Sequence, residues 1–563
     1  MSIAGIINSA TTGLLTAQAR ISLTSTNIDN AQTDGYTKKT AYVGTTATGG
    51  QVTGVTVIGS GNDVDEKIFK KVMEAASEAS YTSVLSSYYE TLVSSLGTTK
   101  DGSDISETLG DLITSLSTMI SDPGATNAGS NIIDAVGNWA NAISTLSDTI
   151  QSTRTTADAG IADAVEQVND LLDQIDGLND RIVALKVQGE STADLEDTRR
   201  VALQNLSQYI DVTTFDTTTG ETYIYTNSGK ALLTGSVHEL SYTASGFLSD
   251  SSAYPGSIPG IVSDGTDVTS DLTGGSIAAL VKVRDDTLPG LQDELDGLVK
   301  TVTTSLNDIA NTGTQVPPAT KLTSDATWSA TSAVVSSTSG SVTVQVVDAS
   351  GNLTTHTLSW TGGSTTVANI ISTLSSYGLS ASLGSDGRLA VSSTYGVAIA
   401  TDGSSAANVF GFNNLFSGST AATVQVKDTL STQGLVSAAV NASATTNYTD
   451  ASSTGVLKSL WSALEANMSF SAAGGLDATT TTVTSYISAL IDDWSDRAET
   501  ASSTADGAET TSSTLSTSFS DTYGVNVTEE TALLTTYQQD YQACAQILST
   551  AQEMWNTLIS MMN

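Results

Sequence analysis

Residues Glu529–Asn563 read EETALLTTYQQDYQACAQILSTAQEMWNTLISMMN. Apolar or nearly apolar side chains recur in this segment at steps that alternate between three and four residues. This spacing is typical of the narrow seam of a coiled coil, and less so of the broader stripe of a surface helix. The seam consists of Leu534, Tyr537, Tyr541, Cys544, Leu548, Ala551, Trp555, Leu558 and Met562. We therefore expect a C-terminal coiled-coil helix whose seam is about 42 Å long.

The N-terminus carries a seam of the same length. Its residues are four and three positions apart and are Ile3, Ile7, Ala10, Leu14, Ala17, Ile21, Thr24, Ile28 and Ala31. Two matched seams at opposite ends of a chain predict that the termini pair with each other. The rest of the chain then forms one long excursion between the two terminal helices.

Further apolar residues lie beside both seams and widen the apolar stripe. They are Ile6, Leu15, Ile547, Met554 and Ile559. A helix that is apolar on two sides needs partners besides the helix it pairs with, so we expect contacts with other copies of the chain. An interface that repeats head to tail without closing produces a helical tube. Periodicity alone is equally compatible with two ordinary core helices of one large globular protein.

Between the seams, helical spacing dominates the chain. The expected helices cover residues 65–96, 105–120, 132–150, 157–185, 192–210, 275–309, 456–468 and 481–518. Short loops between helices of this length favour antiparallel neighbours and hence a bundle. Within the bundle region, residues 211–260 are typical of strands, with a hairpin between Thr222–Thr226 and Ala231–Leu233.

The segment from residue 314 to residue 446 differs in composition from the helical region. It is rich in Ser, Thr, Gly and Val, and Val342, Val344 and Val346 alternate as in a half-buried strand. We interpret this segment as a β-rich domain inserted into the bundle.

The predicted fold is mainly α, with nested and discontinuous domains. Residues 1–58 and 519–563 form a terminal coiled-coil domain for assembly. Residues 59–313 and 447–518 form a central helical bundle, and residues 314–446 form the inserted β-rich outer domain.

The charge of the chain excludes several kinds of partner. Its 563 residues include 21 Lys and Arg against 59 Asp and Glu, which gives a formal net charge of −38. Nucleic acids and anionic membranes attract basic patches, so neither is an expected partner. No run of 18 apolar residues exists that could insert into a membrane, and the N-terminus does not have the pattern of a cleaved secretory signal.

The sequence does not contain a recognisable catalytic or metal-binding pattern. Its two histidines, His238 and His356, lie far apart, and its one cysteine, Cys544, lies on the C-terminal seam and is expected to pack there. We find no nucleophile elbow, phosphate-binding loop or dinucleotide fingerprint. We therefore expect no enzyme activity, no catalytic residue, no metal ligand and no cofactor.

Two stretches resemble the signatures of the flagellar rod, hook and hook-associated proteins. The first is NIDNAQTDGYT at residues 27–37. The second is YGVNVTEE at residues 523–530, followed by YQQDYQA at residues 537–543. Residues 165–210 also resemble the helical arm of the hook-associated proteins, and residues 341–412 resemble the β insertion motif of this family.

The resemblance implies a structural component of the bacterial flagellum that joins hook to filament by helical self-assembly. The implied partners are copies of itself in a helical ring, the hook protein, the next hook-associated protein on the filament side, and an export chaperone bound to the C-terminal helix. The implied location is the extracellular flagellum, reached without a cleaved signal. The alternative is a secreted Ser/Thr-rich surface protein or adhesin, although such a protein would normally carry a cleavable signal.

We expect the subunit interface to include both seams and the N-terminal signature. The predicted interface residues are Ile3, Ile7, Leu14, Ile21, Asn27, Ile28, Asn30, Gly35, Tyr36, Leu534, Tyr537, Tyr541, Cys544, Leu548, Trp555, Leu558 and Met562.

Overall fold

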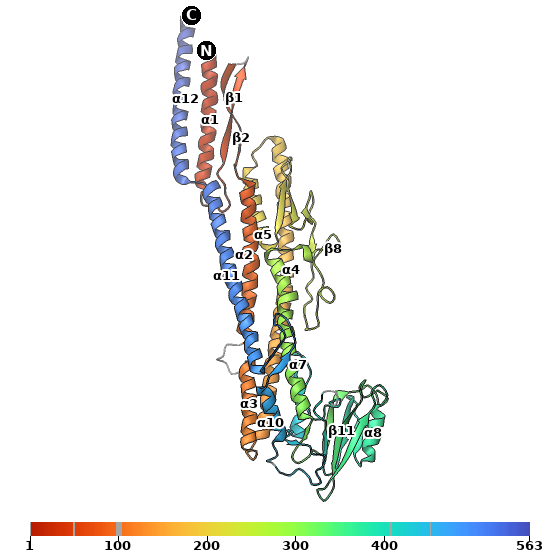
Figure 1. Cartoon of the computed structure of the whole chain (residues 1–563). Helices are drawn as coiled ribbons and strands as arrows, with labels where there is room; N and C mark the ends of the chain where they lie inside the picture. Colours follow the sequence, from red (N-terminus) through yellow and green to blue (C-terminus); the bar gives the residue numbers. More distant parts are fainter. Residues whose placement is uncertain (1, 49–50, 97–103, 405–407, 451, 563) are drawn as a thin grey trace.

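The computed structural model describes residues 2–48, 51–96, 104–404, 408–450 and 452–562. The molecule is elongated, and both termini lie together at one end (Figure 1). A pair of terminal helices and a hairpin occupy that end, a bundle of long helices forms the body, and a β-rich domain lies at the opposite end. The fold is mainly α with an inserted β-rich domain.

The terminal part contains two helices and one hairpin, which are α1 (Ile3–Asp29), α12 (Val527–Met562), β1 (Thr40–Thr48) and β2 (Gln51–Gly61). The Ser2 hydroxyl accepts a hydrogen bond from the Gly5 N–H at 3.2 Å and so caps the start of α1. Strands β1 and β2 pair antiparallel.

The body consists of helices from both halves of the chain. They are α2 (Glu66–Leu96), α3 (Ile105–Ser121), α4 (Ala128–Gln188), α5 (Ala193–Tyr209), α6 (Gly275–Lys282), α7 (Leu288–Ala310), α10 (Gly455–Glu465) and α11 (Val483–Tyr523), with a π-helical turn (Val283–Thr287) between α6 and α7. One continuous apolar core joins them and includes the fully buried Trp139 and Trp494.

Helix α4 corrects the expectation of two separate helices at 132–150 and 157–185. It continues through the polar linker between them, QSTRTT at residues 151–156. The hydroxyls of Thr153 and Thr155 donate to backbone carbonyls one turn earlier, at 2.8 and 2.9 Å, and so remain satisfied inside the helix. Arg154 is buried, because its guanidinium donates to the carbonyls of Ser249 and Ser252. A polar stretch therefore continues the helix when tertiary partners satisfy it.

Small sheets flank the body beside α4. Their strands are β3 (Val212–Asp216), β4 (Thr222–Thr226) and β5 (Ala231–Leu233) in one sheet, and β6 (Leu240–Ser241), β7 (Val262–Ser263) and β8 (Thr266–Asp267) in a second, followed by a 3₁₀ turn (Thr269–Asp271). The hairpin expected from the sequence between β4 and β5 is present.

The inserted domain has its own apolar core, which includes Val344, Leu358 and Phe410. Its larger elements are β10 (Lys321–Thr327), β11 (Gly340–Val347), β12 (Leu353–Trp360), α8 (Val367–Ser376), β13 (Ser380–Leu383), β14 (Arg388–Ser392) and β15 (Val397–Ala400). The sheet orders are β10-β14-β13 and β12-β11-β15.

Short elements connect this domain to the body or, as the hairpin of β19 (Met468–Phe470) and β20 (Thr479–Thr481), belong to the body beside α7. The other elements are β9 (Gly313–Thr314), β16 (Phe416–Ser417), β17 (Gln425–Val426), α9 (Leu430–Gln433) and β18 (Ala438–Ala439). Although the expected insertion ran from 314 to 446, the side chains of Leu415, Phe416 and Val436 belong to the core of the body. The ring of Phe416 packs edge-on against Trp139, at 5.4 Å between centroids.

Candidate functional site: the terminal helix pair and its joint to the body

Helices α1 and α12 pack along each other over most of their length (Figure 1). Small residues allow the close approach: Ala10 and Ala17 of α1 are 5% exposed, and Ala551 of α12 is fully buried. The approach is closest at Gly13, where an added Cβ would lie 2.9 Å from the Cys544 sulfur. Cys544 is thus half-buried in the contact between the two helices.

Helix α1 lies between α12 and the hairpin, whereas α12 lies on the outside. The Asn8 side chain donates to the Thr53 carbonyl of β2 at 3.2 Å, and the Val55 N–H donates to the Thr12 hydroxyl at 3.3 Å. On the other side, Arg20 of α1 lies over the Tyr537 ring of α12, 5.2 Å from its centroid. Helix α1 is therefore covered on two sides, although Leu15 remains exposed, while the extensive contact of α12 among the described residues is with α1.

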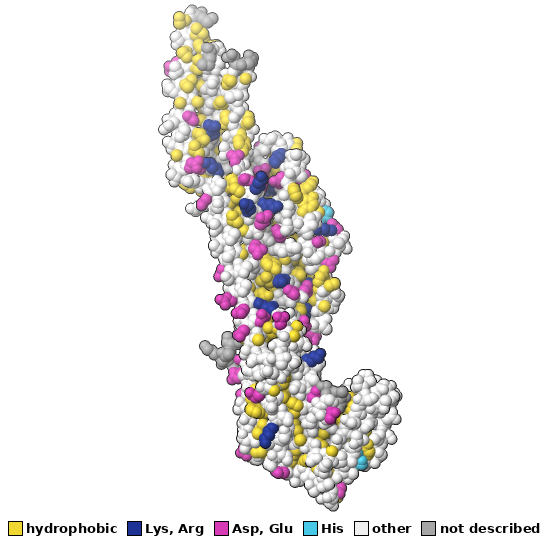
Figure 2. Space-filling model, in the orientation of Figure 1, with side chains coloured by type: hydrophobic (Ala, Val, Ile, Leu, Met, Phe, Trp, Pro, Cys, Tyr) yellow, Lys and Arg dark blue, Asp and Glu magenta, His cyan; other side chains and the backbone are white. Residues whose placement is uncertain are grey.

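Helix α12 has an apolar face that is exposed beside the contact with α1 and toward the C-terminal end of the helix. Its side chains are Tyr541, Ile547, Met554, Trp555, Leu558, Ile559 and Met561, each at least 38% exposed. Yellow hydrophobic side chains are visible along this end of the molecule in Figure 2. An apolar stripe of this length on the outside of a helix is typical of an interaction surface.

The predicted seam residues fall into two groups. Those half-buried between the helices or against the hairpin are Ile3, Ile7, Leu14, Ile21, Ile28, Leu534, Tyr537, Cys544 and Leu548. Those exposed on α12 are Tyr541, Trp555 and Leu558. The side chain of Met562 lies outside what the structure describes. Trp555 and Leu558 thus lie on the same side of α12 as the buried Ala551, but near the C-terminal end of the helix that side is exposed.

The signature after α1 forms a joint between the terminal helices and the body, and Asn27 is at its centre. Asn27 is 1% exposed. Its amide nitrogen donates to the Lys39 carbonyl at 2.9 Å and to the Glu530 carboxylate at 3.0 Å. Its amide oxygen accepts from the Lys39 N–H at 3.0 Å and from the Tyr36 hydroxyl at 2.9 Å. Asn27 is therefore a joint residue buried within its own chain, and its place in the subunit interface stays a prediction.

Two more signature residues shape the loop that follows α1. The Asn30 side chain donates to the Thr26 carbonyl at 2.9 Å and so helps end the helix. Gly35 has φ 71°, and a Cβ there would lie 2.2 Å from the Val201 side chain of α5. Only glycine combines this conformation with so close an approach.

Lys38 connects the joint to the start of α12. Its ammonium lies 3.0 Å from Glu529 and 3.1 Å from Glu530, and its N–H donates to the Tyr523 carbonyl at 2.8 Å. Burial lowers the pKa of Lys38, but hydrogen bonds to the two carboxylates outweigh it and the pKa is raised overall. Lys38 therefore stays charged and holds the two ends of the chain together.

Asp197 of α5 connects the joint to the body. Its carboxylate accepts from the N–H and hydroxyl of Thr37 at 2.9 and 2.7 Å and from the Asn62 side chain at 2.9 Å. It also forms ion pairs with Lys39 and Arg200. Burial, and then the fields of nearby carboxylates, raise the pKa of the neighbouring Tyr36 hydroxyl. Lys39 and Arg200 are both buried, so without Asp197 each would leave a buried charge uncompensated.

Sequence reasoning missed Lys38, Lys39, Asp197 and Glu530 as joint residues. The adjacent lysines directly after the signature were the available signal. Their partners, however, lie more than 150 positions along the chain, and no pattern in the sequence connects them.

The remaining polar residues do not suggest a chemical centre. His238 lies 2.7 Å from the Asp264 carboxylate, and His356 stacks on Tyr377 at 4.1 Å between ring centroids. Among the described residues, no group of three His, Cys, Asp or Glu side chains could hold a metal ion. None of the described helices combines the length and hydropathy that a membrane span requires.

Comparison with known families assigns two parts of the chain. Residues 91–322 match the model "Flagellar hook-associated protein FlgK helical domain". Residues 517–561, which include most of α12, match the model "Flagellar basal body rod FlgEFG protein C-terminal". No curated protein matched the chain.

Among solved structures, the chain is similar to the flagellar hook junction protein FlgK from Burkholderia pseudomallei. The TM-score is 0.48 and the identity 14%, over 81% of this chain and 99% of that one. The chain thus combines a hook-associated helical domain in its body with a rod-type segment at its C-terminus, and both matches support a flagellar hook-associated structural protein.

Proposed function

We propose that this chain is a subunit of the junction between hook and filament, and that it assembles into a helical ring through its two terminal helices. The observation that carries the proposal is the exposed apolar face of α12. The exposed side chains of this face flank the contact with α1 and continue toward the C-terminal end of α12, so they are available to the terminal helices of neighbouring copies. Hook protein would contact one edge of the ring, and a filament-side hook-associated protein would contact the other.

The energetics favour assembly over an isolated helix pair. Each Å² of apolar surface removed from water contributes about 25 cal/mol, so several exposed aromatic and aliphatic side chains on each copy give a large driving force. A repeated head-to-tail contact of this kind builds a helical array. We expect the amides of Ile3–Ala31 and Leu534–Met562 to exchange faster than body amides in the monomer. Strong protection there in the monomer would contradict a latent interface.

The same face also bears on export. We propose that the subunit leaves the cell through the flagellar export channel, and that a chaperone covers the apolar face of the C-terminal helix until then. A bound chaperone would keep Trp555 and Leu558 out of water in the same way as a neighbouring subunit.

The test compares the full chain with a form that lacks residues 534–563. The truncated chain should not assemble in sedimentation experiments, while its circular dichroism melting curve should retain the transition of the body. A finer variant is Trp555→Ser with Leu558→Ser, and its control is Gln542→Ser with Gln546→Ser on exposed positions of the same helix. If the truncated chain still assembles, the terminal helix is not the assembly element.

A second test concerns location. Antibody against the chain should label a thin band at the boundary of hook and filament. Labelling over the whole cell surface would instead support a secreted surface protein.

A further inference from the structure

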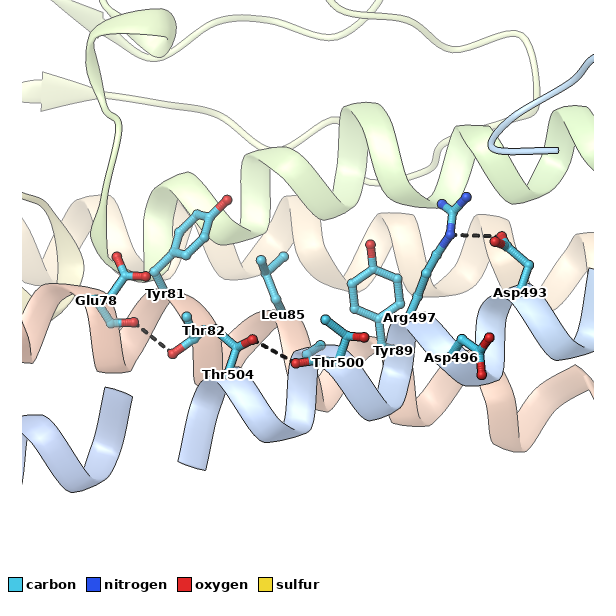
Figure 3. Close-up of a pocket in the computed structure, with 11 residues that line it drawn as sticks. Glu78, Tyr81, Thr82, Leu85, Tyr89, Asp493, Asp496, Arg497, Thr500 and Thr504 are labelled. Atoms are coloured by element: carbon cyan, nitrogen blue, oxygen red, sulfur yellow. Dashed lines mark hydrogen bonds and ion pairs between the residues drawn. The ribbon is translucent and has the colours of Figure 1, made fainter. Parts of the chain in front are cut away.

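A groove of 410 Å³ lies on the flank of the body between α2 and α11 (Figure 3). Tyr81, Leu85 and Tyr89 of α2 form one wall. Asp493 and Arg497 of α11 lie across from them. Tyr89 packs at 5.8 Å from the buried Trp494 ring, which fixes this end of the groove.

The groove has an excess of negative charge. Asp493 and Arg497 form an ion pair at 2.8 Å, and nearby Lys282 pairs with Asp286 at 3.1 Å. Glu78 and Asp496 also line the groove, and both are exposed. Within the part of the chain that the structure describes, neither of these two carboxylates has a cationic partner.

The two tyrosines give the groove a second property. Neither the Tyr81 nor the Tyr89 hydroxyl makes a hydrogen bond to any described residue, and Lys282 is near enough to both to interact electrostatically. Aromatic rings attract cations, and aliphatic stems of lysine pack well on apolar walls. Rings, an apolar wall and free carboxylates together suit the side chain of a lysine.

Two lysines near the start of α2 match this requirement. Lys67 and Lys71 are exposed one turn apart, and neither forms an ion pair with a described residue. They lie on the same face of α2 as Glu78, at the end nearer the joint. Along this face of α2 the charge is therefore positive at Lys67 and Lys71 and negative at Glu78, roughly 10–17 Å further along the helix.

We propose that Lys67 and Lys71 of one copy dock on the groove of the next copy, displaced along the axis of the assembly. A parallel copy shifted by the separation of the two charged regions brings the positive end of one α2 onto the negative groove of its neighbour. Such a contact is heterologous and does not close, so it repeats along an assembly. The inference rests on the proposed self-assembly and adds a second contact, in the body, that sets the register between copies.

The experiment exchanges the charges in the full chain. One variant carries Lys67→Glu with Lys71→Glu, a second carries Glu78→Lys with Asp496→Lys, and a third carries all four changes. Each of the first two should raise the critical concentration for assembly about tenfold, and the third should bring it back toward wild type, because opposite charges again face each other. Wild-type assembly should also weaken at high salt. The matched control is Lys300→Glu with Lys458→Glu, two exposed lysines elsewhere on the body.

Circular dichroism melting checks that each variant is folded. The inference is overturned if the first two variants assemble as wild type does, or if the fourfold variant is no better than either of them. The proposed function fails separately, if removal of residues 534–563 leaves assembly intact.

Discussion

Glu294 brings a carboxylate into the core of the body between α7 and α11. It is fully buried, and it accepts from the Gly475 N–H at 2.7 Å and the Trp494 indole N–H at 2.6 Å. Burial raises its pKa, against the opposing effect of these two hydrogen bonds. The Glu294 carboxylate therefore has a structural role in the body, because its hydrogen bonds connect α7 to α11 and to the turn before β20.

Glu294→Ala should lower the free energy of unfolding by about 2–4 kcal/mol, because two buried donors lose their acceptor and a cavity is left. Urea denaturation measures the change. Glu465→Ala, at an exposed site on α10, should stay within about 0.5 kcal/mol of wild type. Equal effects at the two sites would contradict the structural role of Glu294.

Lys427 is a buried cation where the inserted domain meets the body. Its ammonium donates to the carbonyls of Thr323, Gly411 and Phe412 at 2.8, 3.0 and 2.6 Å. Burial lowers its pKa to about 8, while the field of Asp325 opposes the shift. The buried ammonium loses its proton at a lower pH than the same lysine does in the unfolded chain.

The sign of the resulting pH dependence follows from proton binding. Between pH 8 and about 10.4 the unfolded chain binds more protons at this site, so stability rises with pH across that window, by up to about 3 kcal/mol. Below pH 8 the full penalty of burying the charge is present. Urea unfolding across this range should show the rise in wild type relative to Lys427→Met. If the stability of the two proteins changes with pH in parallel, Lys427 is not the source of the rise.

At the scale of elements, the π-helical turn between α6 and α7 turns Arg284 into the core. The Leu288 N–H donates to the Val283 carbonyl, five residues earlier, and Pro289 has no N–H to continue the regular pattern. Arg284 then forms an ion pair with Asp158 of α4, 3.0 Å away, and both are fully buried. Pro289, which lies inside the helix expected at residues 275–309, is thus found at the start of α7, directly after this wide turn.

The contact between α1 and α12 gives a prediction at the same scale. Gly13→Ala should weaken the pairing of the two helices, because the new Cβ would meet the Cys544 sulfur at 2.9 Å. Cys544→Ala removes that sulfur, so the double variant should recover. Sedimentation of the assembled form measures both.

The control is Gly129→Ala on α4, where a Cβ meets nothing within 4 Å. It should be neutral or stabilise the helix by up to about 1 kcal/mol. If Gly13→Ala with intact Cys544 assembles as well as wild type, then the close approach of the helices does not limit assembly.

At the scale of the whole molecule, the joint determines how the terminal helices are held on the body. Lys39 and Arg200 both depend on Asp197, and removal of one partner from a buried pair leaves an uncompensated charge. Asp197→Ala should therefore broaden the range of orientations between the two parts. Small-angle X-ray scattering should record this as a wider distance distribution, and assembly should weaken.

Asp194→Asn is the matched control. Asp194 lies 3.6 Å from the Lys39 ammonium but is highly exposed, and such pairs contribute at most about 1 kcal/mol. Its scattering curve should overlay that of wild type. A rigid Asp197→Ala variant would mean that the hairpin and loop contacts hold the joint without the ion pairs.

The sequence by itself determined the local structure of this protein. Apolar spacing located both terminal helices and the helices of the body, and the turn residues Asn227–Lys230 located the hairpin between β4 and β5. These features depend on interactions within a few residues, so a linear pattern carries them.

Only the tertiary structure decided which surfaces meet. It placed Leu415–Val436 in the core of the body, made α4 continuous through a polar stretch, and gathered Asn27, Asp197 and Glu530 at one joint. Hydrophobic periodicity indicates that one face of a helix or strand is buried, but it does not identify the element that covers this face. Buried polar groups find their partners across hundreds of residues, and only the folded chain brings those partners within hydrogen-bonding distance.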